Sequence, residues 1–102
     1  MSDILEQIDY NKESGSKPEK PITIYALSTC AFCKKAIEYV KKHDVEFRWV
    51  HLDALELDTK RAVKAELKNR HKNLPVFPVL VYGDKAESGF NEDKWRNTLG
   101  LS

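Results

Sequence analysis

The fold is decided by residues 22–33, which read ITIYALSTCAFC. The first six are mostly apolar, β-branched or aromatic, and they lie between Pro21 and Ser28, so they predict a β-strand. The only two cysteines, Cys30 and Cys33, follow at once with two residues between them, and a helical pattern begins there. Two thiols at this spacing can close a small disulfide and open it again. The stretch therefore predicts a strand, a redox pair and a helix start.

The helix is predicted from about Cys33 to His43, because Ala36, Ile37 and Val40 fall on one face. Free N–H groups and the positive end of the helix dipole point at the first turn, where they favour a thiolate. A thiolate is the attacking species in thiol–disulfide exchange, and it must be reachable by the substrate. Cys30, at the strand-to-helix turn, meets these conditions.

Helical geometry carries Cys33 one turn further, near enough to attack a mixed disulfide on Cys30. We predict a cycle of two steps with Cys30 and Cys33 as the catalytic residues. The Cys30 thiolate attacks a substrate disulfide, and Cys33 then resolves the mixed disulfide, leaving a Cys30–Cys33 bond.

The rest of the chain predicts an α/β fold in the order β-α-β-α-β-β-α, with a four-stranded mixed sheet flanked by helices. The first βαβ unit should be parallel and right-handed. The further elements are a strand over 45–52, a helix over 59–71 capped by Asp58 and broken by Leu74-Pro75, a strand over 78–82, a turn at 83–85, a strand over 86–88, and a helix from a cap at Asn91 to Leu99, ended by Gly100.

The first twenty residues are predicted to form a flexible N-terminal extension, followed by one domain over 21–102. Residues 11–21 are polar and rich in Ser, Gly, Pro and charge, which is typical of a linker. Residues 2–9 have the spacing of a short amphipathic helix. A helix this short is marginal alone, so a frayed extension is favoured over a docking helix.

Composition excludes several classes of function. The chain has 102 residues, 41% of them hydrophobic and 32% charged, as in one small soluble domain. A net charge of +1 gives no case for nucleic acid or for an anionic membrane surface. We find neither the pattern of a signal peptide nor an apolar run near the roughly 20 residues of a membrane span. We therefore expect a monomer in the cytoplasm. In that reducing compartment, two closely spaced cysteines are catalytic or metal-binding rather than a permanent structural disulfide.

Other interpretations of the cysteines stay open. A lone C-x-x-C is half of a tetrahedral zinc site, but His43, His51 and His71 are the only histidines, and no two have a paired spacing. The cysteines could also be inert core residues. We predict no resident metal.

Three blocks in register give the chain a resemblance to the glutaredoxins, within the thioredoxin superfamily, over roughly Pro21 to Leu101. Residues 22–33 look like the family's first strand and its Cys-Pro-Tyr-Cys active site. Residues 77–81 look like the strand opened by a cis-proline, here Pro78. Residues 88–92 resemble the Gly-Gly-(aromatic or Cys)-Asp-Asp segment before the last helix.

The resemblance implies a thioredoxin-like fold with a cis peptide at Phe77–Pro78, lying against the cysteine loop. Backbone groups of Phe77 would pair with the peptide-like part of a disulfide substrate, a small case of strand addition. The implied substrate-binding residues are Phe32, Phe77, Pro78, Gly89, Phe90 and Asn91. No cofactor would be bound, and glutathione would serve as a co-substrate.

Several positions depart from the family pattern. Leu27 stands where glutaredoxins commonly carry a Lys or Arg for the glycine carboxylate of glutathione, and Val76 replaces a usual Thr. Ala31 and Phe32 replace Pro and Tyr. Losing the cation removes a charge-assisted contact of roughly 1.5–3 kcal/mol, so glutathione binding should be weakened. Related glutaredoxin-like redoxins are reduced by thioredoxin reductase instead.

Three hypotheses follow. The first is a small thiol–disulfide oxidoreductase that acts on disulfide-containing proteins, with glutathione or a thioredoxin reductase as electron donor. The second is a metal- or iron–sulfur-binding module on a thioredoxin-like scaffold. The third is a regulatory or scaffold domain that has kept the active site as a relic.

Overall fold

The computed structural model describes residues 4–71 and 76–101. The predicted break at Leu74-Pro75 lies outside these residues. In chain order the elements are η1 (Ile4–Glu6), β1 (Asn11–Glu13), β2 (Ile22–Ala26), α1 (Ala31–Lys42), β3 (Phe47–His51), η2 (Leu52–Ala54), α2 (Leu57–His71), β4 (Val79–Tyr82), β5 (Lys85–Ser88) and α3 (Glu92–Leu99).

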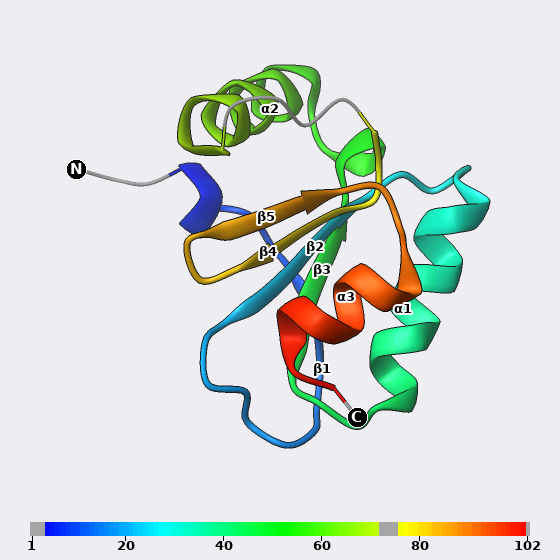
Figure 1. The fold of residues 1–102 in the computed structure, drawn as a ribbon. Helices are drawn as coiled ribbons and strands as arrows, with labels where there is room; N and C mark the ends of the chain where they lie inside the picture. Colours follow the sequence, from blue (N-terminus) through cyan, green and yellow to red (C-terminus); the bar gives the residue numbers. More distant parts are fainter. Residues whose placement is uncertain (1–3, 72–75, 102) are drawn as a thin grey trace.

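The sheet is mixed and has β2 at its centre (Figure 1). The strand order is β1-β3-β2-β4-β5, with β2 parallel to β3 and antiparallel to β4. Thr23 of β2 lies opposite Arg48 on one side and Val81 on the other. The hairpin of β4 and β5 completes the sheet, with Tyr82 opposite Lys85. The predicted α/β class and mixed sheet are confirmed.

The described sheet has five strands, where we predicted four. The additional strand, β1, pairs antiparallel with β3, with Asn11 opposite Trp49 and Glu13 opposite Phe47. Its three residues are all polar, so no alternation of apolar side chains marks it in the sequence. Backbone hydrogen bonds to an edge strand form it without such a pattern.

Residues 4–13, within the segment we expected to be a flexible extension, pack against the domain. Leu5 and Ile8 are buried in one cluster with Val63 and Leu67 of α2. The Tyr10 hydroxyl donates a hydrogen bond of 2.7 Å to the Leu5 carbonyl. Figure 1 shows η1 beside one end of α2. Burial of these side chains on α2 supplies the stabilisation that a short helix lacks alone.

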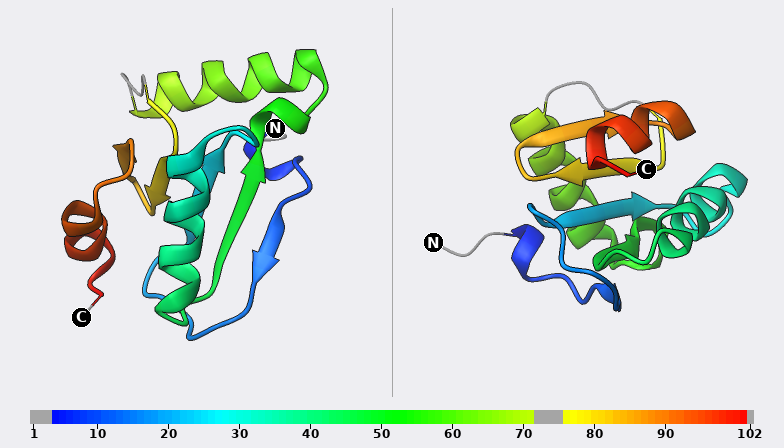
Figure 2. Two further views of the ribbon diagram at one scale, coloured as in Figure 1. Left: turned by 90° about the vertical axis from the view of Figure 1, so that its right-hand side faces the viewer. Right: turned by 60° about the horizontal axis from the view of Figure 1, so that its bottom comes forward.

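Helices cover both faces of the sheet (Figures 1 and 2). Ile22, Ile24 and Ala26 of β2 join the cluster that contains α1 and α3, including Trp95, which is fully buried. Tyr25 joins the cluster of α2. All five residues of β2 are buried, which explains its continuous apolar run. In the described part of the chain, no helix is long and apolar enough to cross a membrane.

Helix ends differ from the prediction at two places. α1 begins at Ala31, two residues early, because Cys30 itself is the N-cap. α2 begins at Leu57, so Asp58 lies in its first turn and is not its cap. The prediction for α3 is confirmed: the Asn91 side chain caps it, and Gly100 ends it with φ at +69°.

Candidate active site

Cys30 lies where a capping side chain normally lies. Its backbone is extended, with φ at −97° and ψ at 113°, and its Sγ accepts a hydrogen bond of 3.1 Å from the Cys33 N–H. The sulfur thus satisfies one of the free N–H groups of the first turn of α1, as an N-cap oxygen does. Since these groups and the helix dipole favour negative charge, the position suits an attacking sulfur. Cys30 is half-buried, so one side of it remains open.

Cys33 has the opposite surroundings. It is 1% exposed and packs in the cluster of Ala36, Ile37 and Trp95. Burial raises the pKa of the Cys33 thiol to about 12, and the hydrogen bond with Cys30 adds to this. Both cysteines are free. The structure therefore brings the two predicted catalytic residues together and makes them chemically unequal.

Asp53, which the sequence did not indicate, accepts hydrogen bonds from the turn before Cys30. Asp53 lies in η2, directly after β3, and its Oδ1 accepts a 3.0 Å hydrogen bond from the Ser28 N–H. Its Oδ2 accepts a short hydrogen bond from the Ser28 hydroxyl. These bonds to Ser28 lower the pKa of the Asp53 carboxyl. Only the parallel pairing of β2 and β3 brings the two residues together, so no local sequence signal reveals the contact.

The peptide bond between Phe77 and Pro78 is cis, as the resemblance implied. Pro78 is fully buried at the start of β4. The Phe77 carbonyl oxygen lies 4.0 Å from the Cys30 Sγ, at the outer limit of a sulfur hydrogen bond. The cis-proline segment and the cysteine loop, 47 residues apart in sequence, therefore meet at this sulfur.

Ser88 and Gly89 hold the segment before the cis-proline in place. The Ser88 hydroxyl accepts a 2.9 Å hydrogen bond from the Val76 N–H and donates one of 2.8 Å to the Val76 carbonyl. The Gly89 N–H donates to the carbonyls of Val76, at 3.1 Å, and of Pro78, at 2.8 Å. Gly89 has φ at +82°, a conformation that L side chains rarely adopt, which explains the glycine.

A pocket of about 350 Å³ lies between these segments. It is lined by Phe32, Val76, Phe77, Ser88, Gly89, Phe90, Asn91 and Lys94. Five of the six predicted substrate-binding residues are among them, and the exception is Pro78, which is fully buried. Phe32 is 61% exposed and Val76 is 55% exposed, so apolar surface is available to a ligand. Sequence analysis missed Val76, Ser88 and Lys94 as lining residues.

The aromatic wall of the pocket is supported from behind. The Phe90 ring packs edge-on against Trp95, with centroids 5.1 Å apart, and lies tilted against Tyr39 at 5.7 Å. Trp95 Nε1 donates a 3.1 Å hydrogen bond to the Gly89 carbonyl. The Asn91 Oδ1 accepts the Lys94 N–H at 3.0 Å, so this oxygen is committed to capping α3.

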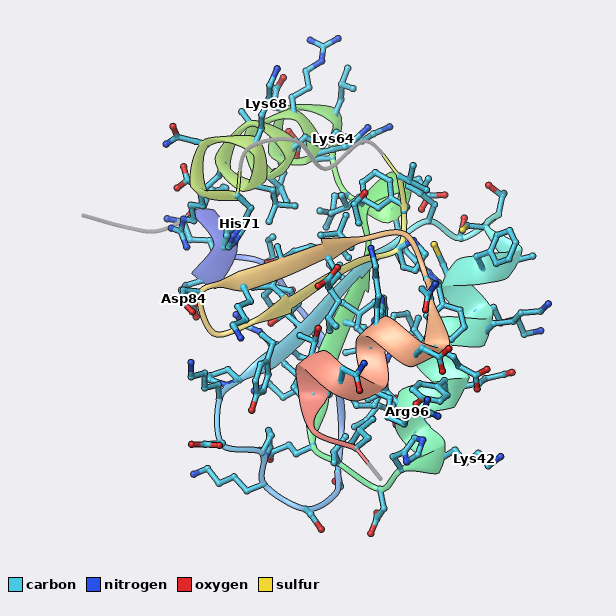
Figure 3. All side chains as sticks on the ribbon, in the orientation of Figure 1. Lys42, Lys64, Lys68, His71, Asp84 and Arg96 are labelled. Atoms are coloured by element: carbon cyan, nitrogen blue, oxygen red, sulfur yellow. The ribbon has the colours of Figure 1, made fainter. Side chains whose placement is uncertain are left out.

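The residues around the pocket determine which charged groups lie near it. Leu27 packs against the apolar cluster of α2 and places no cation near the cysteines. Lys64 of α2, which is labelled in Figure 3, has its Nζ 5.9 Å from the centroid of the Phe77 ring. Over residues 4–71 and 76–101, no group of three or more His, Cys, Asp or Glu side chains is placed to hold a metal ion.

A dithiol at a helix start, beside a cis-proline that precedes the neighbouring strand of a mixed sheet, defines the class of thioredoxin-fold redox proteins. The Glutaredoxin family model matches residues 22–86. The chain therefore belongs to the glutaredoxin family, and the family suggests a redox function.

Solved structures agree with this assignment. The chain is 32% identical to the glutaredoxin from Methanosarcina mazei Go1, with a TM-score of 0.79 over 90% of this chain and 88% of that one. It is 33% identical to Methanosarcina acetivorans methanoredoxin, with a TM-score of 0.80 over 89% and 96%. The glutaredoxin-like NrdH-redoxin from Escherichia coli shares the fold at 23% identity, with a TM-score of 0.59 over 76% and 92%. The comparison with curated proteins found no match.

Proposed function

We propose that this protein is a disulfide oxidoreductase in which Cys30 is the nucleophile and Cys33 the resolving thiol. The observation that carries the proposal is the inequality of the two sulfurs. Cys30 is partly open and accepts an N–H at a helix start, whereas Cys33 is buried and its pKa is about 12. At neutral pH, Cys33 therefore keeps its proton while the substrate reaches Cys30.

The reaction conserves atoms and electrons. The Cys30 thiolate attacks one sulfur of a substrate R–S–S–R′, forming Cys30–S–S–R and releasing R′–S⁻, which takes a proton from water. The Cys33 sulfur then attacks Cys30, its proton passes to the leaving R–S⁻, and a Cys30–Cys33 disulfide remains. The substrate gains two electrons from the protein and two protons, one from Cys33 and one from water, which replaces the proton that Cys30 released on ionising.

The high pKa of Cys33 fits this order of events. Two of its causes are the hydrogen bond that the Cys33 thiol donates to Cys30 and the charge of Cys30. Both depend on a free Cys30 sulfur, so a mixed disulfide on Cys30 removes them. The pKa of Cys33 then falls just when its thiolate is needed, while burial keeps it protonated beforehand.

The pocket beside Cys30 receives the rest of the substrate. Phe32 and Phe90 offer aromatic surface, and the backbone of Phe77 offers hydrogen-bonding groups to a peptide-like ligand. Oxidised protein needs a reductant, and we propose glutathione as co-substrate or a thioredoxin reductase, with no bound cofactor. We place this chemistry in the cytoplasm, on a monomer, with disulfide-containing proteins as substrates.

Single-cysteine variants test the mechanism. Cys30→Ser should abolish the reduction of insulin and of bis(2-hydroxyethyl) disulfide. Cys33→Ser should accumulate a mixed disulfide on Cys30, visible as a mass increase that dithiothreitol reverses. Reduction at the wild-type rate by Cys30→Ser would overturn the proposal.

Two further measurements complete the test. Coupled assays with glutathione plus glutathione reductase, and with thioredoxin reductase, identify the electron donor. Metal analysis of anaerobically purified protein addresses the metal-binding alternative. Stoichiometric zinc or iron that is lost on replacing either cysteine would count against a free dithiol.

A further inference from the structure

We propose that Lys94 makes the pocket beside Cys30 selective for small organic disulfides whose substituents carry a carboxylate. This inference rests on the proposed function, because it concerns the substrate class of the same site. Its test is arranged so that the two can fail separately.

The pocket lies against the reacting sulfur. Phe77 lines the pocket, and its carbonyl oxygen is 4.0 Å from the Cys30 Sγ. Phe32 lines it from the other side and belongs to the first turn of α1, two residues after Cys30. A substituent on a disulfide that reacts with Cys30 therefore has this pocket next to it.

Lys94 gives the pocket its charge. Among the described lining residues it is the only charged one, and the others are apolar or neutral. Over the described part of the chain, no ion pair is formed by the Lys94 ammonium group. Glu92 and Asp93 are its neighbours in sequence, but neither lines the pocket, and Asp93 is paired with Arg96.

The fold holds Lys94 at this wall. Its N–H is bonded to the Asn91 cap, and the next residue, Trp95, is fully buried and bonded to the Gly89 carbonyl. The first turn of α3 is thus fixed against the segment that follows β5. Lys64 lies over the Phe77 ring at 5.9 Å and Lys35 over the Phe32 ring at 5.7 Å, and neither of these lysines lines the pocket. Leu27 is apolar, so among the described residues Lys94 is the one cation that lines the pocket wall itself.

A carboxylate in the pocket gains attraction from Lys94 that a hydroxyl of similar size does not. For a pair that water still reaches, such an attraction amounts to about fivefold in a rate or binding constant. Salt screens it, since the Debye length falls from about 10 Å at 0.1 M to about 3 Å at 1 M.

A charge series of small disulfides tests the inference. Reduced protein is mixed with bis(2-carboxyethyl), bis(2-hydroxyethyl) or bis(2-aminoethyl) disulfide, and the second-order rate of dithiol oxidation is measured in a single turnover. This format needs no external reductant. We expect the dianion to react fastest relative to its own rate with dithiothreitol, which corrects for intrinsic reactivity.

Lys94→Gln should lower the ratio of the carboxylate rate to the hydroxyl rate about fivefold. Lys94→Arg should retain the preference, and Lys94→Glu should shift it toward the amine. The matched control is Lys42→Gln, at the far end of α1 from the cysteines (Figure 3), which should change nothing. In 1 M salt the wild-type preference should disappear.

The outcomes separate the two proposals. If wild-type protein reduces none of the three disulfides, the proposed function fails. If it reduces them all with a ratio that Lys94→Gln and Lys94→Glu leave unchanged, the function stands and the assignment of Lys94 is wrong. Equal loss for all three disulfides in Lys94→Gln would also overturn the assignment, because it would indicate damage to the fold rather than lost attraction.

Discussion

Two segments approach the Cys30 sulfur, and they differ in what they contribute. Residues 27–33 carry both reacting thiols within one turn of helix. Residues 76–91 carry no reacting group but supply most of the pocket wall and the Phe77 carbonyl. The first segment is built by local helix capping, the second by hydrogen bonds between β4 and β5 and the chain before them. The comparison indicates that chemistry and recognition can be disturbed separately.

The largest expected effect lies within the first segment. At pH 7, iodoacetamide should modify Cys30 and spare Cys33, because Cys33 is 1% exposed and its pKa is about 12. Raising a thiol from an ordinary pKa near 8.5 to about 12 lowers its thiolate fraction by a factor on the order of a thousand. Mass spectrometry of the alkylated peptides reads this directly. Comparable rates at the two cysteines would show that the segment is not asymmetric.

The same thiol should make stability depend on alkaline pH. In the unfolded chain Cys33 ionises near pH 8.5–9, whereas in the folded protein it stays protonated up to about pH 12. The unfolded state therefore binds fewer protons, and the free energy of unfolding falls with rising pH by up to about 1.4 kcal/mol per unit.

Urea unfolding of the reduced protein from pH 8 to 10 measures this slope. Cys33→Ser should show a shallower slope. Above pH 10 part of the slope should remain, because burial also raises the pKa of Tyr25. An unchanged slope in Cys33→Ser would mean that the thiol is not held protonated.

Ser88→Ala probes the second segment. It removes both hydrogen bonds to the Val76 backbone, an expected loss of about 1 kcal/mol, because water can reach the freed groups. Disulfide reduction should slow by about fivefold as the Phe77 carbonyl loses its fixed position.

Alkylation of Cys30 should be unaffected in Ser88→Ala, since the first segment is intact. Ser14→Ala, an exposed serine far from the pocket in sequence, serves as the control. A parallel loss of reduction and alkylation would contradict the separation of chemistry from recognition.

The smallest effect concerns the anchor of the first segment. Asp53→Asn removes the charge that accepts the Ser28 hydroxyl and N–H. The pKa of Asp53 is lowered in the folded protein, so its contribution to stability is present above pH 4 and is lost as the pH falls through the lowered value. Unfolding measured between pH 6 and pH 3 should therefore be more pH-dependent in the wild type than in Asp53→Asn.

Ser28→Ala should reproduce the behaviour of Asp53→Asn, and the double variant should add little, because the two residues act through one contact. Additive effects in the double variant would show that Asp53 supports the loop by another route.

Much of this site could be predicted from the sequence, because its signals are local. Each of these signals depends on residues that are close in sequence: the strand over 22–26, the cysteine spacing and the Asn91 cap. Contacts between distant segments gave no such signal. The Asp53–Ser28 pair, the Ser88 bonds to Val76 and the place of Lys94 on the pocket wall each join residues that only the sheet and α3 bring together.

The N-terminal segment is a second case in which contacts with distant residues are not signalled by the local sequence. Its polar strand β1 and its short apolar run have little propensity for order alone. In the structure β1 pairs with β3, and Leu5 and Ile8 pack in the cluster of α2; neither partner is visible from residues 4–13 alone.

By itself, the sequence determined an α/β redox fold with two thiols at the start of a helix, because hydrophobic periodicity and capping are local properties. The tertiary structure decided which thiol is open and which is buried, since burial depends on α3 and the sheet. It also decided what faces the open thiol: a pocket with three phenylalanines and one lysine in its wall, assembled from segments more than forty residues apart.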